Sequence, residues 1–160
     1  MVDLTRRRLF SRKSAEEVSS LLPWVAATDS FTDDCTRCGK CVEACETHII
    51  VNGDGGFPTV DFSRGECTFC YQCAEVCPEP IFLPKSESPW QAKAAIKESC
   101  LATQNVECRS CSDMCDPMAI EFKLQLNKVA QPVINLDGCN GCGACVSVCP
   151  TAAIHVSNTI

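Results

Sequence analysis

Cysteine is the residue type that dominates the chemistry open to this chain. The 160 residues include 16 cysteines and 2 histidines. The cysteines form four groups, which are group one (Cys35, Cys38, Cys41, Cys45), group two (Cys67, Cys70, Cys73, Cys77), group three (Cys100, Cys108, Cys111, Cys115) and group four (Cys139, Cys142, Cys145, Cys149). Such a cysteine content is typical of three classes: disulfide scaffolds, zinc proteins and iron–sulfur proteins.

The spacing within the groups separates these classes. Groups one, two and four have the pattern C-x₂-C-x₂-C-x₃-C. Two-residue spacers keep three thiolates on the concave side of one loop, and the fourth cysteine follows on the next helical turn. A zinc site takes two cysteine pairs far apart, commonly with histidine, so a third cysteine at the same short spacing is surplus. Thiols that point to one centre are also poorly placed for disulfides. The pattern therefore predicts [4Fe–4S] clusters.

The fourth cysteine of each group is expected to serve a neighbouring group. In two-cluster ferredoxins this cysteine ligates the other cluster of the pair. The same exchange here predicts four ligand sets, which are Cys35, Cys38 and Cys41 with Cys77; Cys67, Cys70 and Cys73 with Cys45; Cys139, Cys142 and Cys145 with Cys115; and Cys100, Cys108 and Cys111 with Cys149.

Group three departs from the common spacing, because seven residues separate Cys100 from Cys108. We expect Cys100 to be a ligand, since Cys108, Cys111 and Cys115 keep the remaining spacing and 116–120 resembles the usual continuation of a ferredoxin. The sequence then predicts three regular clusters and a fourth on the irregular group. In the alternative, Cys100 is a buried thiol beside a three-iron or labile cluster.

Two kinds of cysteine group, A (groups one and three) and B (groups two and four), alternate along the chain in the order A-B-A-B. Groups two and four end in Cys-Pro, whereas groups one and three do not, and the groups recur at about 30 residues. After groups one and three, short β-branched runs flank a turn or a polar stretch, at 49–51 and 59–62 and at 119–122 and 133–136, and each pair predicts a hairpin. These features predict a small, metal-stabilised α+β fold with two tandem bacterial-type two-cluster ferredoxin domains.

Two helices are expected outside the cysteine loops. Ser88-Pro89-Trp90-Gln91 has the pattern of a helix start, and the alanine-rich run to about Ala102 would join the two domains. Ser14 and Glu17 form a capping-box pattern for a short N-terminal helix. The expected domains are a basic tail with a short helix at 1–30, a first ferredoxin-like domain at 31–84, and the joint helix with a second domain at 85–160.

Charge and hydropathy limit the partners. The formal net charge is −6, and each [4Fe–4S]²⁺ core with four thiolates adds about −2, so nucleic-acid binding is not expected. No apolar run reaches the roughly 18 residues of a membrane span. Arg6-Arg7-Arg8 resembles a twin-arginine export motif, but a charged segment follows in place of an apolar one. We expect a cytoplasmic protein whose basic tail docks on a partner.

Other residues predict little further chemistry. His48 and His155 have no partners that suggest metal ligation, and Trp24 and Trp90 are expected to pack. No nucleotide-binding or nucleophile motif is present in the sequence, and an enzyme is not expected.

Several stretches outside the bare cysteine spacing are distinctive. They are Arg6-Arg7-Arg8-Leu9, Cys35-Thr36-Arg37-Cys38, Glu43-Ala44-Cys45-Glu46, Gly55-Gly56-Phe57-Pro58, Cys67-Thr68-Phe69-Cys70-Tyr71, Val106-Glu107-Cys108-Arg109 and Cys139-Asn140-Gly141-Cys142-Gly143-Ala144-Cys145. In these the chain resembles, over nearly its whole length, the F-type ferredoxins of the periplasmic nitrate reductase operon (NapF). The irregular third group is a feature of that family.

The resemblance implies a function that the cysteine spacing does not show. It implies a cytoplasmic accessory protein that binds the immature catalytic subunit of periplasmic nitrate reductase before export and assists its maturation, supplying electrons or cluster components. The alternative is a general electron-transfer ferredoxin that carries electrons between other redox proteins.

Overall fold

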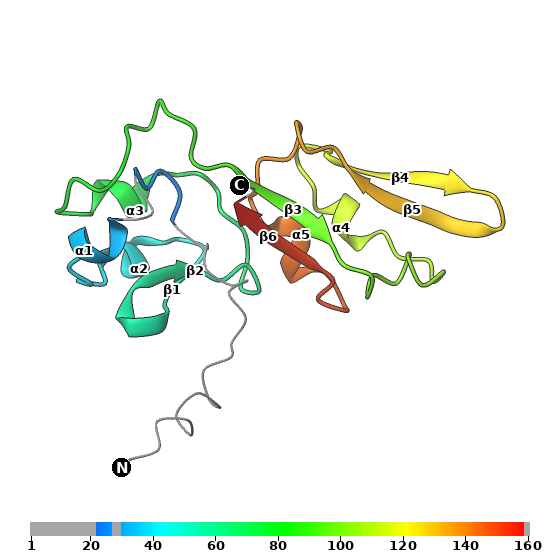
Figure 1. Cartoon of the computed structure of the whole chain (residues 1–160), viewed down its shortest axis with the longest axis horizontal. Coiled ribbons are helices and arrows are strands. Elements are labelled where there is room, and N and C mark those ends of the chain that lie inside the picture. Colours follow the sequence, from blue (N-terminus) through cyan, green and yellow to red (C-terminus); the bar gives the residue numbers. More distant parts are fainter. Residues whose placement is uncertain (1–21, 27–29, 159–160) are drawn as a thin grey trace, which may run out of the picture.

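Two small lobes lie side by side along the long axis of the molecule (Figure 1). The structure is a computed structural model and describes residues 22–26 and 30–158. Its elements, in chain order, are α1 (Phe31–Asp34), α2 (Lys40–Ala44), β1 (Ile50–Asn52), the 3-10 helix η2 (Asp54–Gly56), β2 (Pro58–Val60), α3 (Gln72–Glu75), β3 (Ala92–Ile96), α4 (Ser110–Asp113), β4 (Ile120–Gln125), β5 (Lys128–Ile134), α5 (Ala144–Ser147) and β6 (Ile154–Asn158).

The first lobe is built around the hairpin expected after group one. Strands β1 and β2 pair antiparallel, with Ile50 opposite Val60, and η2 forms the turn between them. The short helices α2 and α3 each follow a cysteine loop. Their small core consists of Leu22, Phe31, Ile49, Ile50, Val60, Cys73 and Ile81. Several cysteines pack directly against this core, so the lobe's apolar interior borders its sulfur atoms.

The second lobe repeats the plan with a longer hairpin. The predicted hairpin after group three is confirmed, and its strands extend through the polar stretch, since β4 pairs with β5 from Ile120–Ile134 to Gln125–Lys128. Figure 1 shows this hairpin projecting away from the first lobe. The core of the second lobe is made of Ala94, Cys111, Ile120, Cys145 and Ile154. Two of its five members are cysteines, which again places sulfur at the centre of packing.

The predicted joint helix is wrong, because the alanine-rich segment forms a strand. β3 pairs antiparallel with β6, with Ala94 opposite Val156 and Ile96 opposite Ile154. The side chain of Ser88 donates to the backbone carbonyl of Trp90 at 3.2 Å instead of capping a helix. The reason lies in burial, since Ala92 and Ala94 are buried on one face, while on the other face Lys93 is half-buried and Ala95 is exposed. Pairing with a partner strand overrides the high helix propensity of alanine.

This strand can be tested with two neighbouring alanines. Ala94 is 3% exposed, and Ala94→Asp should weaken the β3–β6 pairing by at least about 3 kcal/mol because it buries an uncompensated charge. Ala95→Asp, on the exposed face of the same strand, should change stability by about 0.5 kcal/mol or less. Hydrogen exchange at the β3 and β6 amides measures both. Equal effects of the two changes would contradict a strand with one buried face.

The segment before α1 belongs to the first lobe. Trp24 is 4% exposed, its indole N–H donates to the carbonyl of Glu87 at 2.9 Å, and its ring packs edge-on against Tyr71. Val25 forms an isolated antiparallel bridge with Phe82. The predicted packing role of Trp24 is therefore confirmed. The basic run and the helix expected from Ser14 lie outside the described residues.

A search of the described residues finds no helix that is both long and apolar enough to cross a membrane.

Candidate cluster-binding sites

The loops of groups one, two and four share an unusual backbone shape. In each loop the residue just before the second cysteine and the residue just after it adopt positive φ. These pairs are Arg37 and Gly39, Phe69 and Tyr71, and Gly141 and Gly143. The second residue of each pair immediately precedes α2, α3 or α5. One left-handed residue on each side of a cysteine curls the chain around the sulfur atoms of the loop. In group three the residue before α4, Arg109, has φ −132° and lacks this reversal.

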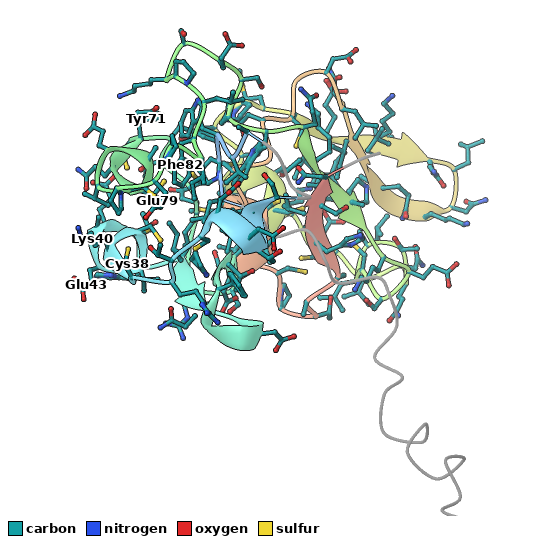
Figure 2. The ribbon with its side chains drawn as sticks, turned by 60° about the vertical axis from the view of Figure 1, so that its left-hand side comes forward. Cys38, Lys40, Glu43, Tyr71, Glu79 and Phe82 are labelled. Atoms are coloured by element: carbon teal, nitrogen blue, oxygen red, sulfur yellow. The ribbon has the colours of Figure 1, made fainter. Side chains whose placement is uncertain are left out.

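One cavity in the first lobe is lined by four cysteines drawn from two groups. They are Cys35, Cys38, Cys41 and Cys77, which is the first predicted ligand set. Lys40, Glu79 and Phe82 line the same cavity. Figure 2 shows Cys38, Lys40 and Glu43 together at one edge of this lobe. Cys38 is exposed, so this cavity opens to the surface.

The second predicted set also comes together. The charge of Cys45 helps to raise the pKa of both Cys67 and Cys73, and the charge of Cys70 acts on the same two thiols. Burial is the largest cause in both cases, and the pKa of Cys67 rises to about 11 and that of Cys73 to about 12. Cys45 therefore lies with the first three cysteines of group two.

The third predicted set lines a cavity in the second lobe. Cys115 of group three and Cys139, Cys142 and Cys145 of group four all border it, together with Gly141 and Gly143. Burial raises the pKa of Cys145 to about 12, and the charges of the other three cysteines add to the rise. This cavity corresponds to the first-lobe cavity, with the fourth cysteine again supplied by the partner group.

The structure brings the fourth predicted set together only in part. The pKa of Cys111 is raised to about 11 by burial and by the charges of Cys100 and Cys108. These three thiols are therefore neighbours although seven residues separate the first two. Cys149 packs against the same core cluster as Cys111. The structure places Cys100 beside its group rather than apart from it.

The turns after the fourth cysteines carry contacts that the sequence analysis missed. The Thr47 hydroxyl lies 3.6 Å from the Cys45 sulfur and the Thr151 hydroxyl lies 3.8 Å from the Cys149 sulfur. Burial alone would raise the pKa of Cys45 and Cys149, but hydrogen bonds from these threonines and from backbone N–H groups lower both. The shared Cys-x-Thr pattern could have identified them.

The two histidines fall on structural positions. His48 has φ +55° in the turn after Cys45, and its N–H donates to the Cys45 carbonyl at 3.0 Å. The same turn recurs after Cys115 and Cys149. His155 lies in β6 opposite Ala95.

The donor sets fit a sulfur-rich cluster. Within the described ranges, no group of three or more His, Cys, Asp or Glu side chains is arranged to hold a single metal ion. The first and third predicted sets each line a cavity. Burial raises the pKa of seven of the sixteen thiols, which are Cys41, Cys67, Cys73, Cys77, Cys111, Cys142 and Cys145, and a bound cationic core would favour their thiolate form. Four thiols around one cavity fit a group that binds four thiolates, as a [4Fe–4S] cluster does.

The chain matches a family model described as a 4Fe-4S dicluster domain twice, at residues 34–81 and 106–153. Each match spans two cysteine groups, in agreement with the two lobes. The chain is also 55% identical over 136 residues to the ferredoxin-type protein NapF of Haemophilus influenzae, and the alignment covers 85% of this chain and 77% of that protein. The chain belongs to the NapF family of ferredoxin-type proteins.

Further relatives extend the NapF assignment. The chain is 44% identical over 156 residues to NapF of Escherichia coli (strain K12), covering 96% of this chain and 94% of that protein. A more distant similarity, at 30% identity over 148 residues, is to the ferredoxin-type protein NapG of the same organism, covering 79% of this chain and 64% of that protein. This member of the NapF family is thus an iron–sulfur protein with two tandem [4Fe–4S] dicluster domains and an α+β fold.

The irregular third group permits a direct test in this NapF-family chain. Cys100→Ser should remove or convert one cluster, lowering the iron content by up to about a quarter of the four-cluster total. The reason is that Cys100 lies beside Cys111. Iron and acid-labile sulfide in anoxically purified protein measure the change. Iron content equal to that of the unmodified chain would show that Cys100 has a packing role.

Proposed function

We propose that the chain binds four [4Fe–4S] clusters in the crosswise sets and serves periplasmic nitrate reductase as an accessory protein. The observation that carries the proposal is the cavity shared by Cys35, Cys38, Cys41 and Cys77, in which the fourth cysteine comes from the neighbouring group. When bound, such clusters supply reversible one-electron transfer. The cysteine loops hold them, and the short helices α2, α3 and α5 fix those loops.

The first-lobe cavity is the best placed of the sites for contact with another protein. Its Cys38 is exposed, and Lys40 and Glu43 lie beside it at the surface (Figure 2). A site that opens to the surface can exchange electrons with a docked partner. The overall charge of −6, made more negative by bound clusters, favours a partner with a basic docking surface.

The partner that the family suggests is the immature catalytic subunit of nitrate reductase. In this proposal the protein acts in the cytoplasm, binds that subunit before export and supplies it with electrons or cluster components during maturation. The basic run at Arg6, Arg7 and Arg8 and the irregular third group support an accessory role, because a simple carrier needs neither. Family analogy supplies the identity of the partner.

The second candidate is a general electron carrier. The regular geometry of groups one, two and four suits it equally well, since these loops would serve any exchange of electrons. Both candidates describe a protein that binds and transfers rather than one that catalyses a reaction on a substrate.

Anoxic co-purification tests the accessory role. The chain should retain the immature catalytic subunit and not the exported, mature form, and about four irons and four sulfides should be present per ligand set. The variant with Arg6, Arg7 and Arg8 changed to Gln should keep its iron. It should bind the immature catalytic subunit more weakly, and that binding should depend less on salt concentration. Equal electron delivery to unrelated redox proteins without retention of the subunit would favour the carrier. Stoichiometric zinc without sulfide would contradict both.

A further inference from the structure

The two lobes meet through their cysteine loops. The backbone N–H of Cys67, in the first lobe, donates to the backbone carbonyl of Cys142, in the second lobe, at 2.8 Å. A ligand loop of one dicluster domain thus lies directly against a ligand loop of the other.

A glycine permits this close approach. The ring of Phe62 packs onto the α-carbon of Gly143, so that a Cβ at this position would overlap three of the ring's atoms. Gly143 has φ +85°. Left-handed φ alone does not explain the glycine, because Tyr71 adopts φ +76° at the equivalent place in group two. Gly39, at the equivalent place in group one with φ +78°, has no atom within 4 Å of its Cβ position.

Side chains on either side brace the same loop. The indole N–H of Trp90 donates to the carbonyl of Asn140 at 2.9 Å. The Trp90 ring also packs edge-on against Phe62 and Phe69, each at 5.9 Å between centroids. Lys93 donates to the carbonyl of Cys139. The group-four loop is therefore held by the first lobe and by the segment that connects the lobes.

The contact between the lobes continues a series of contacts within them. In the first lobe α2, which carries Cys41, contacts α3, which carries Cys73. In the second lobe α4, which carries Cys111, contacts α5, which carries Cys145. Each predicted set thus adjoins the next, and the hydrogen bond from Cys67 to Cys142 crosses between the lobes.

We propose that the contact of Cys67 with Cys142, held by Phe62 on Gly143, is a fixed junction that holds the two inner cluster sites against each other across both domains. This inference rests on the ligand sets of the proposed function. It assigns Phe62, Trp90 and Gly143 as positioning residues for the two inner sites. The two domains then act as one unit, and clusters bound in the inner sites would be held at a fixed separation.

Two glycine variants test the junction. Gly143→Ala and Gly39→Ala place the same methyl group at the same φ, but only the first displaces Phe62. Gly143→Ala should raise hydrogen exchange at the Cys67 amide by at least about tenfold and narrow the spin-coupled part of the electron paramagnetic resonance spectrum of the reduced protein. Gly39→Ala should leave the hydrogen exchange of the Cys67 amide near that of the unmodified chain. Phe62→Ala, which removes the ring and leaves the loop glycine intact, should act like Gly143→Ala.

The outcomes separate the two proposals. If Gly143→Ala and Phe62→Ala leave both the exchange of Cys67 and the spin coupling unchanged, the junction is overturned. If Gly39→Ala changes the exchange of Cys67 as much as Gly143→Ala does, the effect comes from backbone strain and the junction is likewise overturned. If the purified chain lacks iron, the proposed function is contradicted. If in that chain the Cys67 amide still exchanges slowly and Phe62→Ala speeds its exchange, the contact is upheld.

Discussion

Removal of iron and sulfide should abolish most of the tertiary structure of this protein. The buried residues in the described part of the chain are mainly small, and among them only Leu22 and Ile49 are large side chains that are fully buried. Domains normally retain about 5–15 kcal/mol of net stability, and structural zinc in zinc-finger peptides, a comparable case of a metal-dependent fold, contributes about 10–16 kcal/mol. Burial that raises the pKa of Cys73 and Cys145 to about 12 also shows that thiolates there need a cationic partner. The free energy of folding that is lost with the clusters should therefore exceed the net stability of the fold.

Hydrogen exchange before and after anoxic chelation measures this loss. Amides in β1–β2, β3–β6 and β4–β5 should lose their protection together, and the emission of buried Trp24 should shift to the red as water reaches it. Protein carried through the same steps without chelator is the control. A cluster-free chain that keeps protected amides in β3 and β6 would contradict a metal-dependent fold.

Cys77→Ser should damage the cluster of group one and spare that of group two. Cys77 shares a cavity with Cys35, Cys38 and Cys41. Burial raises the pKa of the Cys77 thiol, and the nearby charges of Cys38 and Cys35 contribute. Loss of one of four equal clusters lowers iron by about a quarter.

Cys45→Ser provides the mirror-image control. Cys45 lies with Cys67 and Cys73, so this change should free the group-two thiols and leave group one protected. Anoxic alkylation followed by peptide mapping identifies which thiols each variant exposes. Alkylation of Cys67, Cys70 and Cys73 in Cys77→Ser would show that each group supplies its own fourth ligand.

The sequence by itself determined the chemistry and the repeated plan of the two lobes. Three thiols separated by two-residue spacers can converge only when the loop curls around them, so the spacing specifies the loops locally. The β-branched runs after groups one and three specified their hairpins for the same local reason, since β1 and β2 are joined by a short turn. The third group was also located, because its last three cysteines keep the common spacing.

Tertiary structure alone decided how the lobes are joined. Alanine favours a helix locally, yet 92–96 is a strand because pairing with β6, more than 50 residues away, buries Ala92 and Ala94. The contact of Cys67 with Cys142 likewise joins segments that nothing local connects. Gly143 and Gly39 are indistinguishable by motif and by φ, and only the neighbouring Phe62 ring makes one of them indispensable to the approach of the two loops. Such requirements arise from close packing between distant residues, which local spacing does not encode.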